Sequence, residues 1–181
     1  MQWSAVLPSF LASCLLVSCV PREPPHWAEG GARLVIHPAR WERPDADAIE
    51  ITQDGKVMED GSLLFLVDRA GRVVDEDYEP IAVLLPDGRL VGTDDRFLGR
   101  VGITNASPPH SGTAWLSILP DGTVLLFDSD GERSSGGVWR GCSGPSQRTC
   151  TLVTQIHALR HYRGYEPGPS FGIGVGIGVG Y

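Results

Sequence analysis

The sequence predicts an all-β domain, a small antiparallel barrel, roll or sandwich built from repeated hairpins. From residue 32 onward, short apolar stretches alternate with turns that contain glycine, and few of these stretches are long enough for a helix. Asp-Gly flanked by apolar residues is a strong hairpin signal, because both residues tolerate the positive φ of tight turns. Such pairs occur at Asp54-Gly55, Asp60-Gly61, Asp87-Gly88, Asp121-Gly122 and Asp130-Gly131.

The composition fits one globular domain with appendages. The chain has 181 residues, and its 41% hydrophobic content excludes wholesale disorder. It carries 22 acidic and 15 basic residues, for a net charge of −7. An acidic chain lacks the positive charge that nucleic-acid binding requires, so no nucleic-acid partner is expected.

Ten segments carry the apolar, β-branched or aromatic residues typical of strands. A faint repeat is also present, because Asp54, Asp87 and Asp121 lie 33 and 34 residues apart in similar contexts. A closed propeller needs at least four blades of about 40 residues, and this chain has room for only about three. The repeat therefore indicates stacked hairpins. The predicted strands are 33–37, 48–52, 63–68, 72–75, 81–85, 89–92, 100–104, 114–119, 123–128 and 137–140.

One short C-terminal helix is predicted over 151–162. Apolar residues recur there at spacings of 4, 3 and 3, which places them on one helical face. An extended structure is also compatible with this segment, because 151–154 contains several β-branched residues. The apolar face would consist of Leu152, Ile156, Leu159 and Tyr162, with His157 and His161 largely outside it.

The N-terminus has the features of an export signal. Residues 1–20 are uncharged and mostly apolar, and Pro8 weakens the alternative of a membrane-spanning helix. The run ends in Leu16-Val17-Ser18-Cys19. This motif resembles the lipobox of bacterial lipoprotein precursors, in which Leu, a small or aliphatic residue and Gly, Ala or Ser precede the cysteine.

The resemblance implies that Cys19 is lipidated and becomes the mature N-terminus. The lipid would attach the protein stably to a membrane of the cell envelope, because two or three acyl chains anchor firmly. The outer membrane is the expected location in preference to the inner one. A second lipobox ends at Cys14, but cleavage there would leave only about ten residues of apolar signal. The same segment is also compatible with an ordinary secretory signal or with an uncleaved anchor.

Four regions follow from these patterns: a signal peptide over 1–18, a Pro/Gly-rich tether over 19–31, the β domain over 32–163 and a Gly-rich tail over 164–181. In the tail, Ile173, Val175, Ile177, Val179 and Tyr181 would share one face of a strand, with glycines on the other. This tail is expected to pack on the domain as a last strand, to associate with a membrane or partner, or to stay disordered.

Processing before Cys19 would leave Cys142 and Cys150 as the two free thiols, separated by a turn-rich segment. In an oxidising envelope compartment such a pair predicts a disulfide. A zinc site with His157 and His161 is the rival, but neither ligand interval matches the spacing of zinc fingers. No metal and no cofactor are therefore expected.

No nucleophile or phosphate-binding motif is present in the sequence. His110 beside Ser111 falls in a predicted loop, where neighbouring positions alone do not make a catalytic pair. Trp115 and Trp139 fall on predicted strands and are expected to fill the core. If they instead faced outward with Tyr78, the three rings would form a platform for carbohydrate.

The sequence therefore predicts a lipid-anchored envelope protein that acts as a non-catalytic binding or structural module. Its expected partners are the membrane, through the lipid on Cys19, and an envelope protein or glycan. The alternative is a secreted or anchored hydrolase whose site is assembled from loops. Insertion of the Gly-rich tail into the outer membrane is a third hypothesis.

Overall fold

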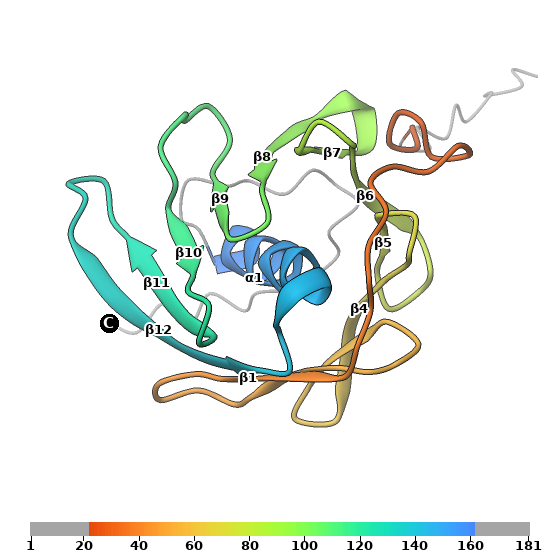
Figure 1. Ribbon diagram of the computed structural model, residues 1–181. Helices are drawn as coiled ribbons and strands as arrows, with labels where there is room; N and C mark the ends of the chain where they lie inside the picture. Colours follow the sequence, from red (N-terminus) through yellow and green to blue (C-terminus); the bar gives the residue numbers. More distant parts are fainter. Residues whose placement is uncertain (1–21, 162–181) are drawn as a thin grey trace, which may run out of the picture.

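Residues 22–161 are the part of the chain that this computed structural model describes, and they form a closed antiparallel barrel of twelve strands. Each strand pairs with its neighbours in the sequence, and β1 pairs with β12 to close the ring (Figure 1). The predicted all-β class is confirmed, with the barrel as its architecture. The strands are β1 (Ala39–Glu42), β2 (Ile49–Ile51), β3 (Lys56–Glu59), β4 (Ser62–Val67), β5 (Arg72–Val74), β6 (Pro80–Leu84), β7 (Arg89–Gly92), β8 (Phe97–Val101), β9 (Asn105–Ser107), β10 (Leu116–Ile118), β11 (Thr123–Phe127) and β12 (Arg133–Arg140).

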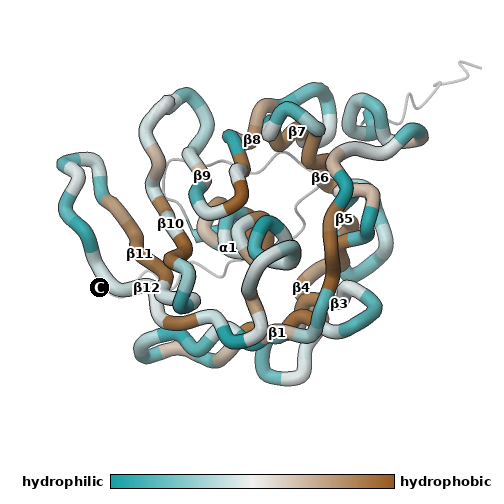
Figure 2. The backbone as a smooth tube through the Cα atoms, viewed as in Figure 1, coloured by the Kyte–Doolittle hydropathy of each residue, from teal (hydrophilic) through white to brown (hydrophobic). Residues whose placement is uncertain are grey.

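The helix α1 (Gln147–His161) lies in the centre of the ring of strands (Figure 1). The short turn η2 (Gly144–Ser146) leads the chain from β12 into this helix, and a second short turn, η1 (Thr93–Asp95), joins β7 to β8. Most of α1 is buried, including Leu152, Val153 and Ile156. Apolar residues recur along the strands, brown in Figure 2, and the buried ones pack against the helix in a single core.

Five polar side chains of α1 are buried as well, and each finds a hydrogen-bond partner elsewhere in the barrel. Burying an unpartnered hydroxyl or amide costs about 1–3 kcal/mol, so these bonds are needed for the helix to sit inside. The hydroxyl of Thr149 donates to the carbonyl of Val35 (2.8 Å), and the hydroxyl of Thr151 donates to the carbonyl of Ile103 (2.7 Å). The side-chain amide of Gln147 donates to the carbonyl of Ile118 (3.2 Å). The side-chain amide of Gln155 donates to the carbonyls of Leu98 (3.1 Å) and Ser107 (3.0 Å).

Tight turns at one end of the barrel, here called the glycine end, share one design. In each, a glycine with positive φ donates its amide to the carbonyl three residues earlier and accepts, through its own carbonyl, an amide from the following strands. The repeat unit is therefore one hairpin, and the predicted step of 33–34 residues spans two hairpins. The glycines are Gly55, Gly71, Gly88 and Gly122, and the amides that they accept belong to Val67, Leu84, Val101 and Trp139.

Several predicted boundaries are wrong. Segment 33–37 pairs with no strand, because it crosses the glycine end, where Leu34 donates its amide to the carbonyl of Arg69 and is itself buried. Strands β1, β3 and β9 were not predicted. The helix is confirmed, but it begins at Gln147 and is buried on most sides instead of one.

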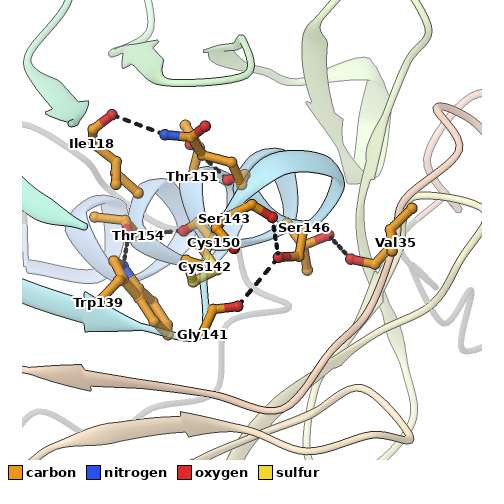
Figure 3. The surroundings of a disulfide bond; sticks show 12 residues. Val35, Ile118, Trp139, Gly141, Cys142, Ser143, Ser146, Cys150, Thr151 and Thr154 are labelled. Atoms are coloured by element: carbon orange, nitrogen blue, oxygen red, sulfur yellow. Dashed lines mark hydrogen bonds between the residues drawn. A yellow bond between two sulfur atoms is a disulfide. The ribbon is translucent and has the colours of Figure 1, made fainter. Parts of the chain in front are cut away.

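Cys142 and Cys150 form the predicted disulfide, with their Cα atoms 6.1 Å apart (Figure 3). The bond joins the segment after β12 to the first turns of α1, where the chain turns inward. Thr154 accepts the indole N–H of Trp139 at 2.9 Å and donates to the carbonyl of Cys150 at 2.8 Å. The disulfide therefore belongs to the packed base of the helix.

Residues 22–31, assigned to the tether, lie against the outside of the barrel. Trp27 packs on Val83, Leu85 and Val91 of the outer face. Nearer the N-terminus, the amide of Arg22 donates to a carboxylate oxygen of Asp94 (3.1 Å), and the amide of Asp94 donates to the carbonyl of Arg22 (3.0 Å).

Within residues 22–161, no helix combines the length and apolar character needed to cross a membrane.

Candidate functional site

A cavity of about 470 Å³ opens between the C-terminal half of α1 and the strands β1, β10, β11 and β12. This volume lies in the range of pockets that bind small molecules. Its apolar walls are formed by Leu116, Leu126, Phe127 and Ala158, together with the rings of Trp41 and Trp115. We call this opening the aromatic cavity, after the rings that line it. The disulfide lies at the other end of α1.

The ring of Trp41 forms one wall of the cavity and is held in place by two contacts. Its ring stacks on Trp139 with centroids 5.6 Å apart, and its indole N–H donates to the carbonyl of Gly136 at 2.8 Å. Residue 136 must be small, because a Cβ atom there would lie 2.8 Å from the side chain of Val124. Trp115 stands opposite, half-buried, and its indole N–H donates to Gln155 of α1 at 2.6 Å.

Arg43, just after β1, is the cationic group at the cavity. Its side chain is only 10% exposed, and its Cζ lies 5.6 Å from the ring centroid of Trp41. The guanidinium forms an ion pair with Glu59 and donates from Nε to the carbonyl of Asp47 at 2.7 Å. A further donor, Nη1, lies 2.8 Å from Nε2 of His157. These contacts fix the guanidinium in place.

The contact with Arg43 determines the protonation of His157. A guanidinium can only donate, so Nε2 of His157 must accept, and the ring must be neutral with its proton on Nδ1. Burial lowers the pKa of His157 to about 3, and the nearby charges of His161, Arg43 and Arg160 contribute to this lowering. His161 follows one turn later, exposed at the rim, with its ring centroid 4.5 Å from that of His157.

The residues considered for catalysis lie apart from this cavity. His110 is exposed in the loop between β9 and β10. The carboxyl groups with shifted pKa values are exposed as well; hydrogen bonds within or near surface turns lower the pKa of Asp54, Asp87 and Asp121. Over residues 22–161, no cluster of three or more His, Cys, Asp or Glu side chains could hold a metal ion.

The three aromatic residues considered as core or as a carbohydrate platform lie in different places. Trp139 is buried in the core as expected, whereas Trp115 lies just before β10 and lines the cavity. Tyr78 is 63% exposed in the turn between β5 and β6, so the three rings form no carbohydrate platform. Cys19 and the Gly-rich tail lie outside the described residues.

Sequence reasoning missed the cavity itself. Its residues come from three distant regions, namely the start of the barrel, the strands β10 to β12 and α1. The spacing of His157 and His161 was the one local signal, and it was considered only as part of a zinc site, which the ligand intervals did not support. A scan against models of protein families, a search of curated proteins and a search of solved structures each find no match to this chain.

Proposed function

We propose that the chain is a lipid-anchored protein of the cell envelope and that its barrel is a non-catalytic binding module. The observation that carries the proposal of binding is the aromatic cavity, with its apolar walls and its fixed polar groups at the mouth. Pockets that bind small molecules are mostly apolar, with a few placed polar groups that orient the ligand. The other buried apolar side chains inside the barrel belong to the core cluster around α1.

The lining of the cavity supports a particular class of ligand. Trp41, Trp115 and Phe127 line it with aromatic rings, and His157, which also lines it, carries its proton on Nδ1, the nitrogen that Arg43 does not contact. A small molecule or exposed group with an aromatic or aliphatic body and one hydrogen-bond acceptor, such as a carboxylate, matches these features. A sugar matches them less well, because its hydroxyls need more polar partners than these walls provide. An envelope protein or glycan could present such a group.

The state of the polar side chains in the cavity favours binding over hydrolysis. A general base works best with a pKa near the operating pH, and His157 has a pKa of about 3. Its Nε2 is also already engaged by Arg43. The hydroxyl of Thr154 accepts from Trp139 and donates to the carbonyl of Cys150, so it is not poised as a nucleophile.

The position of Arg22 bears on the proposed anchor. Cys19 precedes Arg22 by three residues, and Arg22 is bonded to Asp94 beside β7 and β8. Three residues span at most about 10 Å. A lipid on Cys19 would therefore hold that edge of the barrel close to the membrane surface, with little freedom to swing away.

The anchor is tested by the intact mass of the mature protein from its native membrane, with Cys19→Ala as the variant and Cys14→Ala as the matched control. We expect a chain that begins at Cys19 and carries a lipid-sized increment, lost in Cys19→Ala and kept in Cys14→Ala. An unmodified chain in the native membrane would contradict the anchor.

The binding site is tested with 8-anilinonaphthalene-1-sulfonate, an aromatic probe that carries an acceptor group. We expect saturable binding with one site per chain, weakened about tenfold or more by Ala158→Trp, which would fill the cavity. Tyr78→Ala, on a surface away from the cavity, should leave binding unchanged. Near-UV circular dichroism of each variant confirms native packing, since the probe also binds partly folded chains. Equal binding to the filled variant would disprove the site.

A further inference from the structure

Exposed apolar side chains gather at the glycine end of the barrel. Because each strand pairs with its neighbours in the sequence, successive turns alternate between the two ends. Ile103, in the turn between β8 and β9, and Leu119, in the turn between β10 and β11, both lie at the glycine end. Ile103 is 63% exposed, and Val35 and Leu119 are 39% and 37% exposed. Tyr78, as exposed as Ile103, lies at the opposite end.

Val35 belongs to the segment that crosses the glycine end. Buried and exposed side chains alternate over residues 32–37, as they do on a strand with one covered face. Leu34 is buried, whereas its neighbours Arg33 and Val35 are exposed. The inner face of this segment therefore closes the barrel, and its outer face is presented to solvent.

The first turns of α1 hold the exposed apolar residues around the start of the helix. The carbonyls of Val35 and Ile103 accept hydroxyl groups of the helix at 2.8 and 2.7 Å. The carbonyl of Ile118, next to Leu119, accepts a side-chain amide of the helix at 3.2 Å. We call Val35, Ile103 and Leu119 the apolar patch. Pro145, exposed in the turn η2 that leads into α1, adds to it.

Most carboxylates of the glycine end are already engaged within their own turns. The carboxylate of Asp68, for example, accepts the backbone amides of Ala70 and Arg72. Asp121 accepts the amide of Thr123 in the same way. The other turns follow this design, and the ion pairs that result are Asp54–Lys56 (3.1 Å), Asp68–Arg72 (2.9 Å) and Asp87–Arg89 (2.7 Å).

Arginines at the same end exceed these carboxylates. Arg33, Arg69 and Arg100 are exposed, and within residues 22–161 none of them forms an ion pair. The pKa of Asp87 is lowered by hydrogen bonds from Arg89 and also by the charge of Arg100. Two guanidinium groups thus lie near one carboxylate, beside the turn that carries Ile103.

The opposite end of the barrel has the reverse charge. Its turns are rich in carboxylates, and the charge of the domain is therefore unevenly distributed along the barrel axis. Such a distribution orients a charged partner as it approaches. The acidic residues of the turns β5–β6 and β11–β12 are Asp75, Glu76, Asp77, Glu79, Asp128, Asp130 and Glu132.

We propose that the glycine end is a second binding surface, separate from the aromatic cavity, and that its partner is a protein with an apolar centre and an acidic rim. Protein interfaces have an apolar centre and are enriched in arginine, and complementary charges select the partner. The apolar patch supplies the centre, and Arg33, Arg69 and Arg100 supply the rim. An anionic glycan would match the arginines but would leave Ile103 without an apolar contact.

The choice of a protein over an anionic membrane rests on the proposed anchor. Arg22 is bonded to Asp94 in the turn between β7 and β8, at the end opposite the apolar patch. A lipid three residues before Arg22 would hold that end near the membrane. The glycine end would then face away from the membrane, toward other components of the envelope.

Photo-crosslinking of the full-length protein in its native membrane tests the surface. p-Benzoylphenylalanine at position 103 should join the chain to one discrete acidic protein, whereas the same residue at position 78, equally exposed at the opposite end, should not. Arg100→Glu should reduce this crosslink about tenfold, because it reverses a charge of the rim. Arg133→Glu, an exposed arginine at the opposite end, is the matched control and should leave the crosslink unchanged.

The crosslinked protein is then purified and its affinity for the barrel is measured. We expect the dissociation constant to increase about tenfold in Arg33→Glu and in Arg100→Glu, and to increase with salt, because exposed charges are screened. Equal crosslinks at positions 103 and 78, their absence at 103, or an affinity indifferent to both substitutions would overturn the surface.

A vesicle experiment separates this inference from the proposed anchor. Cys19→Ala protein is mixed with phosphatidylglycerol vesicles, and we expect no binding through the glycine end. Vesicle binding that Arg100→Glu abolishes would assign the surface to a membrane and overturn the protein partner. If the mature chain carries no lipid but position 103 still gives the charge-dependent crosslink, the anchor fails and the surface stands.

Discussion

Gly122 and Trp139 meet through their backbones at the glycine end of the barrel. The carbonyl of Gly122 accepts the amide of Trp139 at 2.8 Å, and a Cβ atom on Gly122 would lie 2.1 Å from the carbonyl oxygen of Trp139. The turn also requires a φ of +89° at Gly122. Conformation and space therefore both restrict this position to glycine, and Trp139 belongs to the strand that leads into the helix.

This double restriction can be measured with a matched pair of variants. Gly131 has a similar φ of +81° in an Asp-Gly turn, but a Cβ there meets nothing within 4 Å. Gly131→Ala should cost about 1 kcal/mol, the contribution of left-handed backbone alone. Gly122→Ala should cost about 2 kcal/mol more, because the strand must shift as well. Urea unfolding gives both values, and equal losses would show that the close approach is relieved without cost.

Gln155 is expected to be among the least replaceable residues of the helix. It is fully buried, donates to the carbonyls of Leu98 and Ser107, and accepts from the indole of Trp115. Gln155→Leu keeps the side-chain volume but leaves the two carbonyls and the indole N–H without hydrogen-bond partners. The free energy of unfolding should therefore fall by about 3 kcal/mol. Gln53→Leu, in an exposed turn, should change it by less than about 0.5 kcal/mol. A loss below about 1 kcal/mol for Gln155→Leu would mean that water replaces the amide.

The stability of the fold should depend on pH through His157. Its pKa is about 3 in the folded chain and about 6.5 in the unfolded chain. Between these values the unfolded state binds a proton that the folded state does not, so stability is lost as the pH falls below about 6.5. From pH 7 to pH 5 this effect amounts to about 2 kcal/mol. Burial of the ring, followed by the charges of His161, Arg43 and Arg160, sets the size of the effect, and Arg43 is itself paired with Glu59.

His157→Gln isolates this contribution, because the amide oxygen can still accept from Arg43 but does not titrate. Urea unfolding at pH 7 and pH 5 should show a smaller acid loss for His157→Gln than for the unsubstituted protein, by about 2 kcal/mol. His161→Gln, at the exposed rim, should keep most of the loss. The same pH dependence in all three proteins would show that His157 takes up its proton without unfolding.

Reduction of the disulfide should weaken the fold without abolishing it. Cys142 and Cys150 are separated by 8 positions in the sequence, and closing so short a loop stabilises by about 2.5 kcal/mol in the chain-entropy model. Thermal unfolding with and without a reductant measures this difference. Cys142→Ser/Cys150→Ser should match the reduced protein and show no further response to reductant. Insensitivity of the unsubstituted chain to reductant would indicate that the bond is absent or inaccessible.

The sequence predicted the hairpins well because their signals are local. Asp87-Gly88 and Asp121-Gly122 mark turns of the barrel, and β7 was predicted with its observed limits. Strand β1 was missed because only Ala39 and Trp41 face inward, too short an alternation to stand out. The path of 33–37 depends on carbonyls of distant turns, which no local pattern reveals.

The position of the helix could not be predicted from its hydrophobic pattern. Thr149, Thr151 and Gln155 are polar by sequence, yet all three are buried because carbonyls of the barrel satisfy them. That pattern indicated a helix lying on a surface with one apolar face. The cavity was hidden for the same reason, since its walls meet only when the helix lies inside the closed barrel.

The central helix also fixes the order in which the molecule can be completed. Arg40 pairs with Arg140, so the ring closes only when strands 100 residues apart in sequence have both been made. The helix that fills the ring is the last described element of the chain. Long-range closure of this kind is slow compared with hairpin formation. A chain still emerging from synthesis or export would consist of separate hairpins around an unfilled centre, and would acquire its native core only once residue 161 is free.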